Sequence, residues 1–228
     1  MSECWIVTGG TGALGSAIVE AALEAGDRVV VPWIVDSERE RLARACADAV
    51  DSGRLELLQA DVAEEDGAAA VASRAGETFV LVNGVGGFGG GTPVHETELE
   101  LWDRMYRMNV RTAAAMSRAV APGMIERGRG LIVNVASQAA ADAPPGIAAY
   151  AASKAAVSVL TRALQQELGE HGVRVNAIVP TTIDTPANRE AMPDADFSAW
   201  TPPAQIAGVI RWLASPAGAT VRGGLIPV

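Results

Sequence analysis

The sequence predicts an α/β protein with a doubly wound parallel sheet, which carries helices on both faces. Short apolar runs alternate with longer helical stretches along all 228 residues. Most of these runs are continuously apolar, which is typical of parallel strands that are covered on both sides. A glycine-rich turn, residues 9–15, joins the first apolar run to the first helical stretch, as in doubly wound sheets.

Seven apolar runs are expected to form the strands. In chain order they are residues 4–8, 28–31, 55–59, 79–82, 131–135, 174–179 and 225–228. Capping-box spacings predict helix starts at Ser37 and Thr97, and Thr201 precedes a proline as an N-cap residue would. Three glycines are expected to end helices: Gly26, Gly128 and Gly172. Because no linker, repeat or low-complexity tract interrupts this order, we expect one domain over residues 1–228.

Composition excludes several classes of protein. Hydrophobic residues make up 49% and charged residues 20%, which excludes a disordered chain. The net charge of -9 would repel phosphate backbones, so we expect no nucleic-acid partner. Two cysteines, Cys4 and Cys46, are too few for a disulfide scaffold and are expected to be reduced. An acid near the start, Glu3, and six glycines within the longest uncharged run, 78–94, predict a cytoplasmic protein that does not bind a membrane.

Residues 180–201 do not fit the alternation of strands and helices, because they contain two prolines and several charges without periodicity. They follow a predicted strand at the edge where open α/β sheets bind ligands. A connection of this length in a compact domain is usually functional or disordered. We interpret it as a mobile lid over a substrate, with apolar surface from Met192, Phe197 and Trp200.

The glycine-rich turn indicates a dinucleotide site. Glycines let the backbone approach a pyrophosphate, which binds at the positive N-terminus of the following helix. Glycine-rich turns also join strands to helices for steric reasons alone. Here, however, the turn follows Thr8 at the end of the first strand, where a dinucleotide site belongs.

The end of the second predicted strand bears on the choice of cofactor. An acid about 20 residues after the turn commonly binds the ribose 2′-hydroxyl, but this chain has Trp33 there. Trp33 could stack on an adenine or simply pack. Without an acid to repel a 2′-phosphate, and with Arg39 and Arg41 nearby, the sequence slightly favours NADP(H). Asp36 could move inward and reverse that preference.

Four polar residues indicate a reaction site. Tyr150 and Lys154 lie four residues apart, on one face of a predicted helix over residues 149–168. A tyrosine with its usual pKa near 10 is a poor base, but a nearby ammonium favours the phenolate. Ser137 ends a predicted strand and could donate to a substrate oxygen, whereas Asn109 is unfavourable within a predicted helix and needs a reason. Each has a structural explanation alone, but together, behind a dinucleotide loop, they indicate catalysis.

In these motifs the sequence resembles the short-chain dehydrogenases/reductases over essentially the whole chain. The motifs are Thr8-Gly9 to Gly15, Asp61-Val62, Asn83-Gly84, Asn109, Ser137, Tyr150-x-x-x-Lys154 and Pro180-x-x-Ile183-x-Thr185. The resemblance implies a seven-stranded Rossmann fold in three layers, α/β/α, and the cofactor NAD(P)(H). It also implies a homodimer or homotetramer that is built through two long helices.

The resemblance implies a role for each residue. Tyr150 would be the general acid/base, Ser137 would orient the reacting group, Lys154 would bind the ribose and lower the tyrosine pKa, and Asn109 would support a proton relay. The expected cofactor-binding residues are Thr8, Gly9, Gly12, Ala13, Leu14, Gly15, Trp33, Asp61, Val62, Asn83, Gly84, Tyr150, Lys154, Pro180, Ile183 and Thr185.

Two departures qualify the resemblance. Ala13 follows Gly12 where the family places its middle glycine, and Trp33 replaces the acid of NAD-preferring members. Residues 184–202 and 84–90 are similar to dihydropteridine reductases, which reduce a quinonoid pterin with NADH and work without the family serine. This chain has that serine and lacks the strand-two aspartate of those enzymes.

We expect an NAD(P)(H)-dependent oxidoreductase that moves hydride between the nicotinamide and a small carbonyl or alcohol substrate. One alternative is an activity like that of quinonoid dihydropteridine reductase. The other is a dinucleotide-sensing protein without catalysis, against which the intact set of four polar residues argues. His95 and His171 lie far apart without metal-ligand spacing, so no metal is expected.

Overall fold

A computed structural model describes residues 2–228 and contains one seven-stranded sheet. The strands are β1 (Cys4–Thr8), β2 (Arg28–Trp33), β3 (Leu55–Gln59), β4 (Thr78–Asn83), β5 (Gly130–Val135), β6 (Val173–Val179) and β7 (Leu225–Pro227). Their order is β3-β2-β1-β4-β5-β6-β7, and every neighbouring pair is parallel. The predicted doubly wound parallel sheet, with a strand in each of the seven apolar runs, is confirmed.

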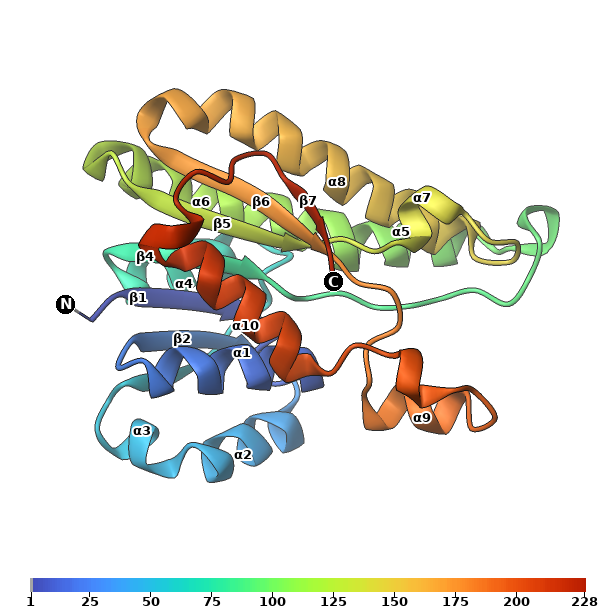
Figure 1. Cartoon of the computed structure of the whole chain (residues 1–228), viewed down its shortest axis with the longest axis horizontal. Coiled ribbons are helices and arrows are strands. Elements are labelled where there is room, and N and C mark those ends of the chain that lie inside the picture. Colours follow the sequence, from blue (N-terminus) through green and yellow to red (C-terminus); the bar gives the residue numbers. More distant parts are fainter. Residues whose placement is uncertain (1) are drawn as a thin grey trace.

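Helices cover both faces of the sheet (Figure 1). They are α1 (Ala13–Glu24), α2 (Asp36–Ala45), α3 (Ala47–Asp51), α4 (Glu65–Ala75), α5 (Leu99–Tyr106), α6 (Thr112–Arg127), α7 (Ala139–Asp142), α8 (Ala148–Leu168), α9 (Pro186–Ala191) and α10 (Pro203–Ala214). A π-helical turn, Arg107–Arg111, joins α5 to α6. Short 3-10 turns are Val94–Glu96, Gly169–His171, Phe197–Ala199 and Pro216–Gly218. None of the described helices is long and apolar enough to cross a bilayer.

The sheet has a separate hydrophobic core on each face, because successive side chains of a strand point to opposite faces. Val7 and Val31 pack under α1 and α10, which lie side by side (Figure 1). Ile6 and Val30 pack under α4 and α6 on the other face. Since both faces are buried, every strand position favours an apolar residue, which explains the continuous apolar runs.

The strand order reverses at β1, which lies between β2 and β4. The chain winds outward from β1 to β3 and then returns to place β4 on the other side of β1. Ligands of open α/β sheets bind outside the carboxyl ends of the strands at such a reversal. The turn after β1 and the segment after β4 therefore border the expected ligand crevice.

The three predicted helix starts are wrong in detail. Backbone in the extended region makes Val35, Glu98 and Pro202 the N-cap residues, and no side chain caps α2, α5 or α10. The Thr97 hydroxyl instead donates to the Pro93 carbonyl oxygen at 2.9 Å, which leaves it outside the helix. Of the predicted helix ends, Gly128 follows α6 with a left-handed φ of 65° and is confirmed.

Candidate active site

The first side of the site is built where β1 and β4 end. The Thr8 hydroxyl donates to the Val82 carbonyl oxygen and accepts from the backbone N–H groups of Gly84 and Val85. Gly9 has a left-handed φ of 66°, and a Cβ on it would lie 2.7 Å from the Gly84 carbonyl carbon. The loop after β1 can therefore lie against the loop after β4 only because both positions are glycine.

The N-terminus of α1 is open to a ligand. Its N-cap residue, Gly12, has no side chain to cap the first turn, and that turn contains no acid. A Cβ on Gly15 would lie 2.0 Å from the Gly9 carbonyl oxygen, so glycine there lets α1 pack against the loop. Ala13, which replaces the family's middle glycine, is exposed and leaves this packing intact. Free N–H groups and the helix dipole suit a pyrophosphate, so these residues fit a dinucleotide.

Trp33 ends β2 and packs within the protein. Its ring lies 5.4 Å from the guanidinium carbon of Arg39, and its buried indole N–H has no acceptor among the described residues. Arg39 also forms an ion pair with Asp36, with 2.7 Å between Nε and Oδ1. Arg39 thus partly neutralises the Asp36 carboxylate. The following Ile34 is 68% exposed, so the surface beside Trp33 is apolar.

Two charged residues of α2 reach the glycine-rich turn. Thr11 Oγ1 donates to Glu38 Oε2 at 2.9 Å, and Arg41 Nη2 donates to the Thr11 carbonyl oxygen at 2.7 Å. The sequence analysis considered Arg41 and missed Glu38. The signal for Glu38 was its helical spacing of three residues from Arg41, which puts the two on one face of α2.

Tyr150 and Lys154 lie one turn apart near the start of α8. Lys154 Nζ donates to the Val135 carbonyl oxygen at 2.8 Å, and burial lowers the pKa of Lys154 to about 8. Burial raises the pKa of Tyr150, and the neighbouring Ser137 hydroxyl offsets part of that rise. The protein alone thus holds Tyr150 as a neutral phenol. Desolvation dominates in the protein alone, and the lowering expected from Lys154 together with a bound cofactor stays a prediction.

Ser137 lies two residues beyond β5, beside Tyr150. It is 6% exposed, and its Oγ accepts from the Ala139 backbone N–H at 3.2 Å. Its hydroxyl is also the group that offsets part of the rise in the Tyr150 pKa. Ser137 and Tyr150 thus place two hydroxyl groups together at the carboxyl end of the sheet.

Asn109 occupies the π-helical turn rather than an α-helix. Its Oδ1 accepts from the Gly87 N–H at 2.9 Å, and its Nδ2 donates to the Gly87 carbonyl oxygen at 3.1 Å and to Ser153 Oγ at 2.9 Å. A Cβ on Gly86 would lie 2.8 Å from Asn109 Oδ1 and 3.3 Å from Lys154 Nζ, so the Asn109 amide and the Lys154 ammonium both lie beside Gly86. The π-turn explains why an asparagine, which is unfavourable within an α-helix, stands at this position.

Asn83 ends β4, but its side chain turns away from the crevice. Its Nδ2 donates to Asn134 Oδ1 at 2.8 Å and to Ser117 Oγ at 3.2 Å, and Asn134 in turn donates to Thr161. This buried polar network ties β4 and β5 to α6 and α8. Only the backbone of Asn83 and Gly84 borders the crevice.

Asp61 and Val62 follow β3. Asp61 Oδ1 accepts from the Ala63 N–H at 2.9 Å, and Asp61 Oδ2 forms an ion pair of 2.8 Å with Arg107. Val62 is buried against α4 and α6. Arg107 therefore fixes the Asp61 carboxylate beside the expected adenine position, a contact that the sequence did not reveal.

The segment 180–201 contains more regular structure than expected. Figure 1 shows α9 set off from the sheet, and Thr185 Oγ1 caps it by accepting from the Asn188 N–H at 3.2 Å. Ile183 pairs with Thr201, which closes the base of the segment. The Pro180 carbonyl oxygen accepts from the Gln138 N–H at 2.9 Å, so the connections after β5 and β6 meet. The segment is thus not irregular, although its mobility stays a prediction.

The apolar residues of this segment pack among themselves. The rings of Phe197 and Trp200 lie 4.7 Å apart, and the Arg189 guanidinium lies 4.6 Å from the Phe197 ring. Arg189 also forms a bidentate ion pair with Asp184 and lowers the pKa of that carboxyl. Its charge is therefore neutralised within the segment.

Comparison with known proteins decides the family. A family model described as short chain dehydrogenase matches residues 3–196. The chain belongs to the short-chain dehydrogenases/reductases. A galactitol 2-dehydrogenase from Rhizobium johnstonii is 32% identical and covers 98% of this chain and 92% of its own.

Two solved structures agree. A 3-oxoacyl-[acyl-carrier protein] reductase from Brucella melitensis with bound NAD is 29% identical, with a TM-score of 0.88 over 99% of this chain and 89% of its own. A blue fluorescent protein from a metagenomic library in complex with NADPH is 30% identical, with a TM-score of 0.86 over 99% and 96%. Members of this family are oxidoreductases that act on alcohols and carbonyls with NAD(P), and this chain is one of them. These relatives give no support to the resemblance to dihydropteridine reductases.

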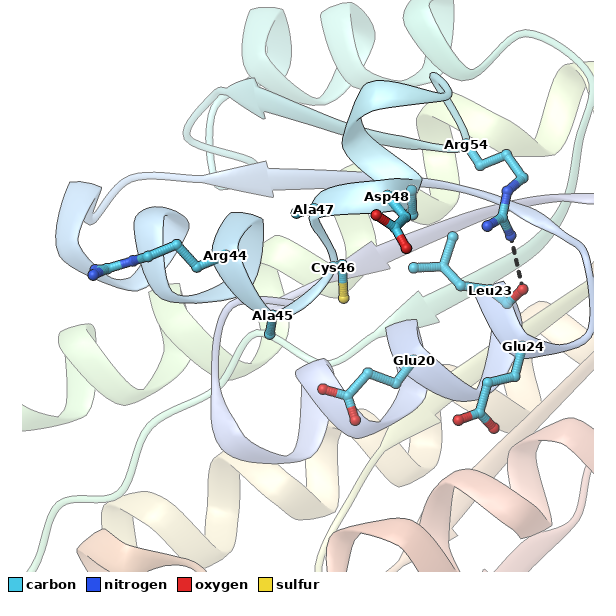
Figure 2. A pocket seen from close by; sticks show the side chains of 10 residues that line it. Glu20, Leu23, Glu24, Arg44, Ala45, Cys46, Ala47, Asp48 and Arg54 are labelled. Atoms are coloured by element: carbon cyan, nitrogen blue, oxygen red, sulfur yellow. Dashed lines mark hydrogen bonds between the residues drawn. The ribbon is translucent and has the colours of Figure 1, made fainter.

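This short-chain dehydrogenase/reductase also has a pocket of about 460 Å³ whose lining includes neither Tyr150 nor Lys154 (Figure 2). Glu20 and Glu24 from the last turns of α1 line it, together with Arg44 from the last turn of α2 and Cys46 just after that helix. Burial raises the pKa of the Cys46 thiol. The pocket lies at the opposite end of α1 from the glycine-rich turn. Within residues 2–228, no three histidine, cysteine or acidic side chains gather in a group that could hold a metal ion.

Proposed function

We propose that this chain is an NAD(P)(H)-dependent oxidoreductase in which Tyr150 exchanges a proton with the oxygen of a carbonyl or alcohol substrate. The bound nicotinamide would supply or accept the hydride at the carbon of that group. The observation that carries the proposal is the placement of Tyr150 and Ser137 together, beyond an open α1 N-terminus that suits a pyrophosphate.

The raised pKa of Tyr150 keeps its hydroxyl protonated, which is the form that carbonyl reduction needs. A neutral phenol can donate its proton to the oxygen that gains negative charge when hydride reaches the carbon. Ser137 would donate a hydrogen bond to the same oxygen and orient it. Alcohol oxidation needs the phenolate instead, so the rate of oxidation is expected to increase at higher pH.

Lys154 and Asn109 would support this exchange. Lys154 would bind the cofactor ribose from its place beside Val135 O and keep a positive charge near the phenol. Asn109 borders the same point as Lys154 and would form part of a proton relay. Because the Asn109 amide already bonds Gly87, we also assign it the task of holding the loop after β4.

The cofactor would lie across the strand reversal. The glycine-rich turn would bind the pyrophosphate through backbone N–H groups, Asp61 and Val62 would border the adenine, and the segment from Pro180 to Thr185 would border the nicotinamide. The sequence-based preference for NADP(H) has support from Arg41 at the glycine-rich turn, while Glu38 at the same turn opposes it. The preference is therefore set by the balance of these two charges.

Three further features belong to the proposal. Residues 180–201 would act as a lid, and hydrogen exchange should slow there when cofactor and substrate are both added.

The protein would be cytoplasmic and form a homodimer or homotetramer through its long helices, α6 and α8. Val159 on α8, 64% exposed, gives apolar surface for such an interface. Light scattering at known concentration measures the assembly.

The direct test is turnover. The purified chain is mixed with NADH or NADPH and a panel of ketones, and the loss of nicotinamide absorbance is followed. Reduction of at least one ketone supports the proposal. A chain that binds cofactor but turns over neither ketones nor alcohols would instead be a dinucleotide sensor, and selective turnover of quinonoid dihydropterin would restore the pteridine alternative.

A further inference from the structure

The glycine-rich loop after β4, residues 84–91, is held against its neighbours rather than free. The Asn109 amide bonds both backbone groups of Gly87, and the Gly91 N–H donates to the Gly146 carbonyl oxygen at 2.8 Å. A Cβ on Gly87 would lie 2.4 Å from Met108 Cε, and one on Gly90 would lie 2.6 Å from Ile147 Cγ2. Glycine at these positions lets the loop approach the π-turn on one side and residues 143–147 on the other.

This packing presents one large side chain, that of Phe88. Its ring meets the Tyr150 ring edge to face, with centroids 5.1 Å apart and an interplanar angle of 64°. Phe88 is nevertheless 68% exposed, so most of its surface has no partner within the protein. An exposed phenylalanine on a fixed backbone beside the proton donor can bury its free face against whatever the donor acts on.

The surroundings of Phe88 are uncharged. The loop itself and residues 143–147 contain no charged side chain. Arg189, the cation of the segment 180–201, is already paired with Asp184. These segments therefore offer no counter-charge to a substrate carboxylate or phosphate, and the ammonium of Lys154, which lies beside Gly86, is buried and donates to the Val135 carbonyl oxygen.

We propose that Phe88 determines substrate choice by forming an apolar wall beside Tyr150, so that the preferred substrates are uncharged ketones or secondary alcohols with a ring attached to the reacting carbon. This inference rests on the proposed function and adds the substrate class to it. A flat ring can stack on the free face of Phe88 while its carbonyl oxygen reaches the hydroxyls of Tyr150 and Ser137.

The kinetic test compares an aryl ketone, acetophenone, with a small polar ketone, dihydroxyacetone. The wild-type chain should show the higher kcat/KM for acetophenone. Phe88→Ala should lower that value about tenfold, mainly through KM, and leave the value for dihydroxyacetone within about twofold. Phe88→Leu keeps apolar surface and should recover part of the loss. The matched control is Leu99→Ala, which removes a 75% exposed side chain from the start of α5.

A second measurement needs neither substrate nor cofactor. The chain has two tyrosines, so Tyr150 alone remains in a Tyr106→Phe background and its ionisation can be followed by phenolate absorbance. Because Phe88 covers part of Tyr150, Phe88→Ala should move the raised pKa of Tyr150 down toward its usual value, and Leu99→Ala should not.

The outcomes distinguish a failure of the proposed function from a failure of the inference about Phe88. If the wild-type chain reduces neither ketone nor any other carbonyl, the proposed function fails. If it reduces ketones but Phe88→Ala lowers both values of kcat/KM equally, or changes neither, the inference about Phe88 is overturned and the proposed function stands. A preference of the wild-type chain for dihydroxyacetone would also overturn it.

Discussion

The side-chain amide of Asn109 pairs with the backbone of Gly87 in both directions, accepting from its N–H at 2.9 Å and donating to its carbonyl oxygen at 3.1 Å. Asn109 belongs to the π-turn before α6, whereas Gly87 belongs to the loop after β4. The pair therefore fixes the loop that carries Phe88 relative to the π-turn, and so helps to hold Phe88 beside the Tyr150 ring.

Asn109→Ala should leave both backbone groups of Gly87 without partners and lower the free energy of unfolding by about 2 to 3 kcal/mol. It should also lower the pKa of Tyr150, because Phe88 would no longer be held against the ring. Urea denaturation and phenolate absorbance in the Tyr106→Phe background measure the two effects. Ser153→Ala is the control, since it removes one partner of Asn109 and keeps both bonds to Gly87. Equal shifts of the Tyr150 pKa in both variants would contradict this role.

Lys154 is the only lysine in the sequence, so lysine-selective ¹⁵N labelling should give a single side-chain signal. Burial lowers its pKa to about 8, and the signal should titrate there. An unfolded lysine keeps its proton up to about pH 10.4, so the folded state binds fewer protons between these values and stability rises with pH. The Lys154 contribution to this rise, which is the difference between the wild-type chain and Lys154→Met, should amount to about 2 kcal/mol from pH 8 to 10. The buried thiols of Cys4 and Cys46 have raised pKa values and act in the opposite direction in both chains. Titration near pH 10.5 would contradict the burial.

Much of the fold followed from the sequence because its signals are local. Continuous apolar runs fix the seven strands, since a parallel strand covered on both faces has no polar side. The helix starts were harder to predict, because hydroxyls such as Thr97 found other partners within the turn. The short helix α9 within residues 180–201 was not predicted, because the prolines there interrupt any helical pattern in the sequence.

The candidate site was predictable in its residue types but not in its contacts. The π-turn at Asn109 and the inward side chain of Asn83 depend on packing between elements far apart in sequence. Glu38 reaches Thr11 only because α2 folds back over the glycine-rich turn. One overlooked observation was compositional: Lys154 is the single lysine among many arginines, and lysine is the cation whose pKa shifts readily on burial.

Cofactor choice should respond to the two charges at Thr11. Glu38→Gln removes a carboxylate that repels a 2′-phosphate and should improve NADPH binding relative to NADH about fivefold to tenfold. Arg41→Gln should have the opposite effect. Glu24→Gln, an exposed change at the other end of α1 from the glycine-rich turn, is the control. Dissociation constants for both cofactors come from the fluorescence of the bound nicotinamide. An unchanged ratio in Glu38→Gln would remove Glu38 from this role.

The most direct test of the central claim is Tyr150→Phe, measured for both turnover and cofactor binding. The substitution removes the hydroxyl and keeps the ring, so the contact with Phe88 should persist. Turnover of a ketone should fall by about a hundredfold to ten-thousandfold, the usual worth of a general acid, while the dissociation constant of the reduced cofactor stays within about twofold. Turnover within about tenfold of the wild-type value would contradict the assignment of Tyr150 as the proton donor.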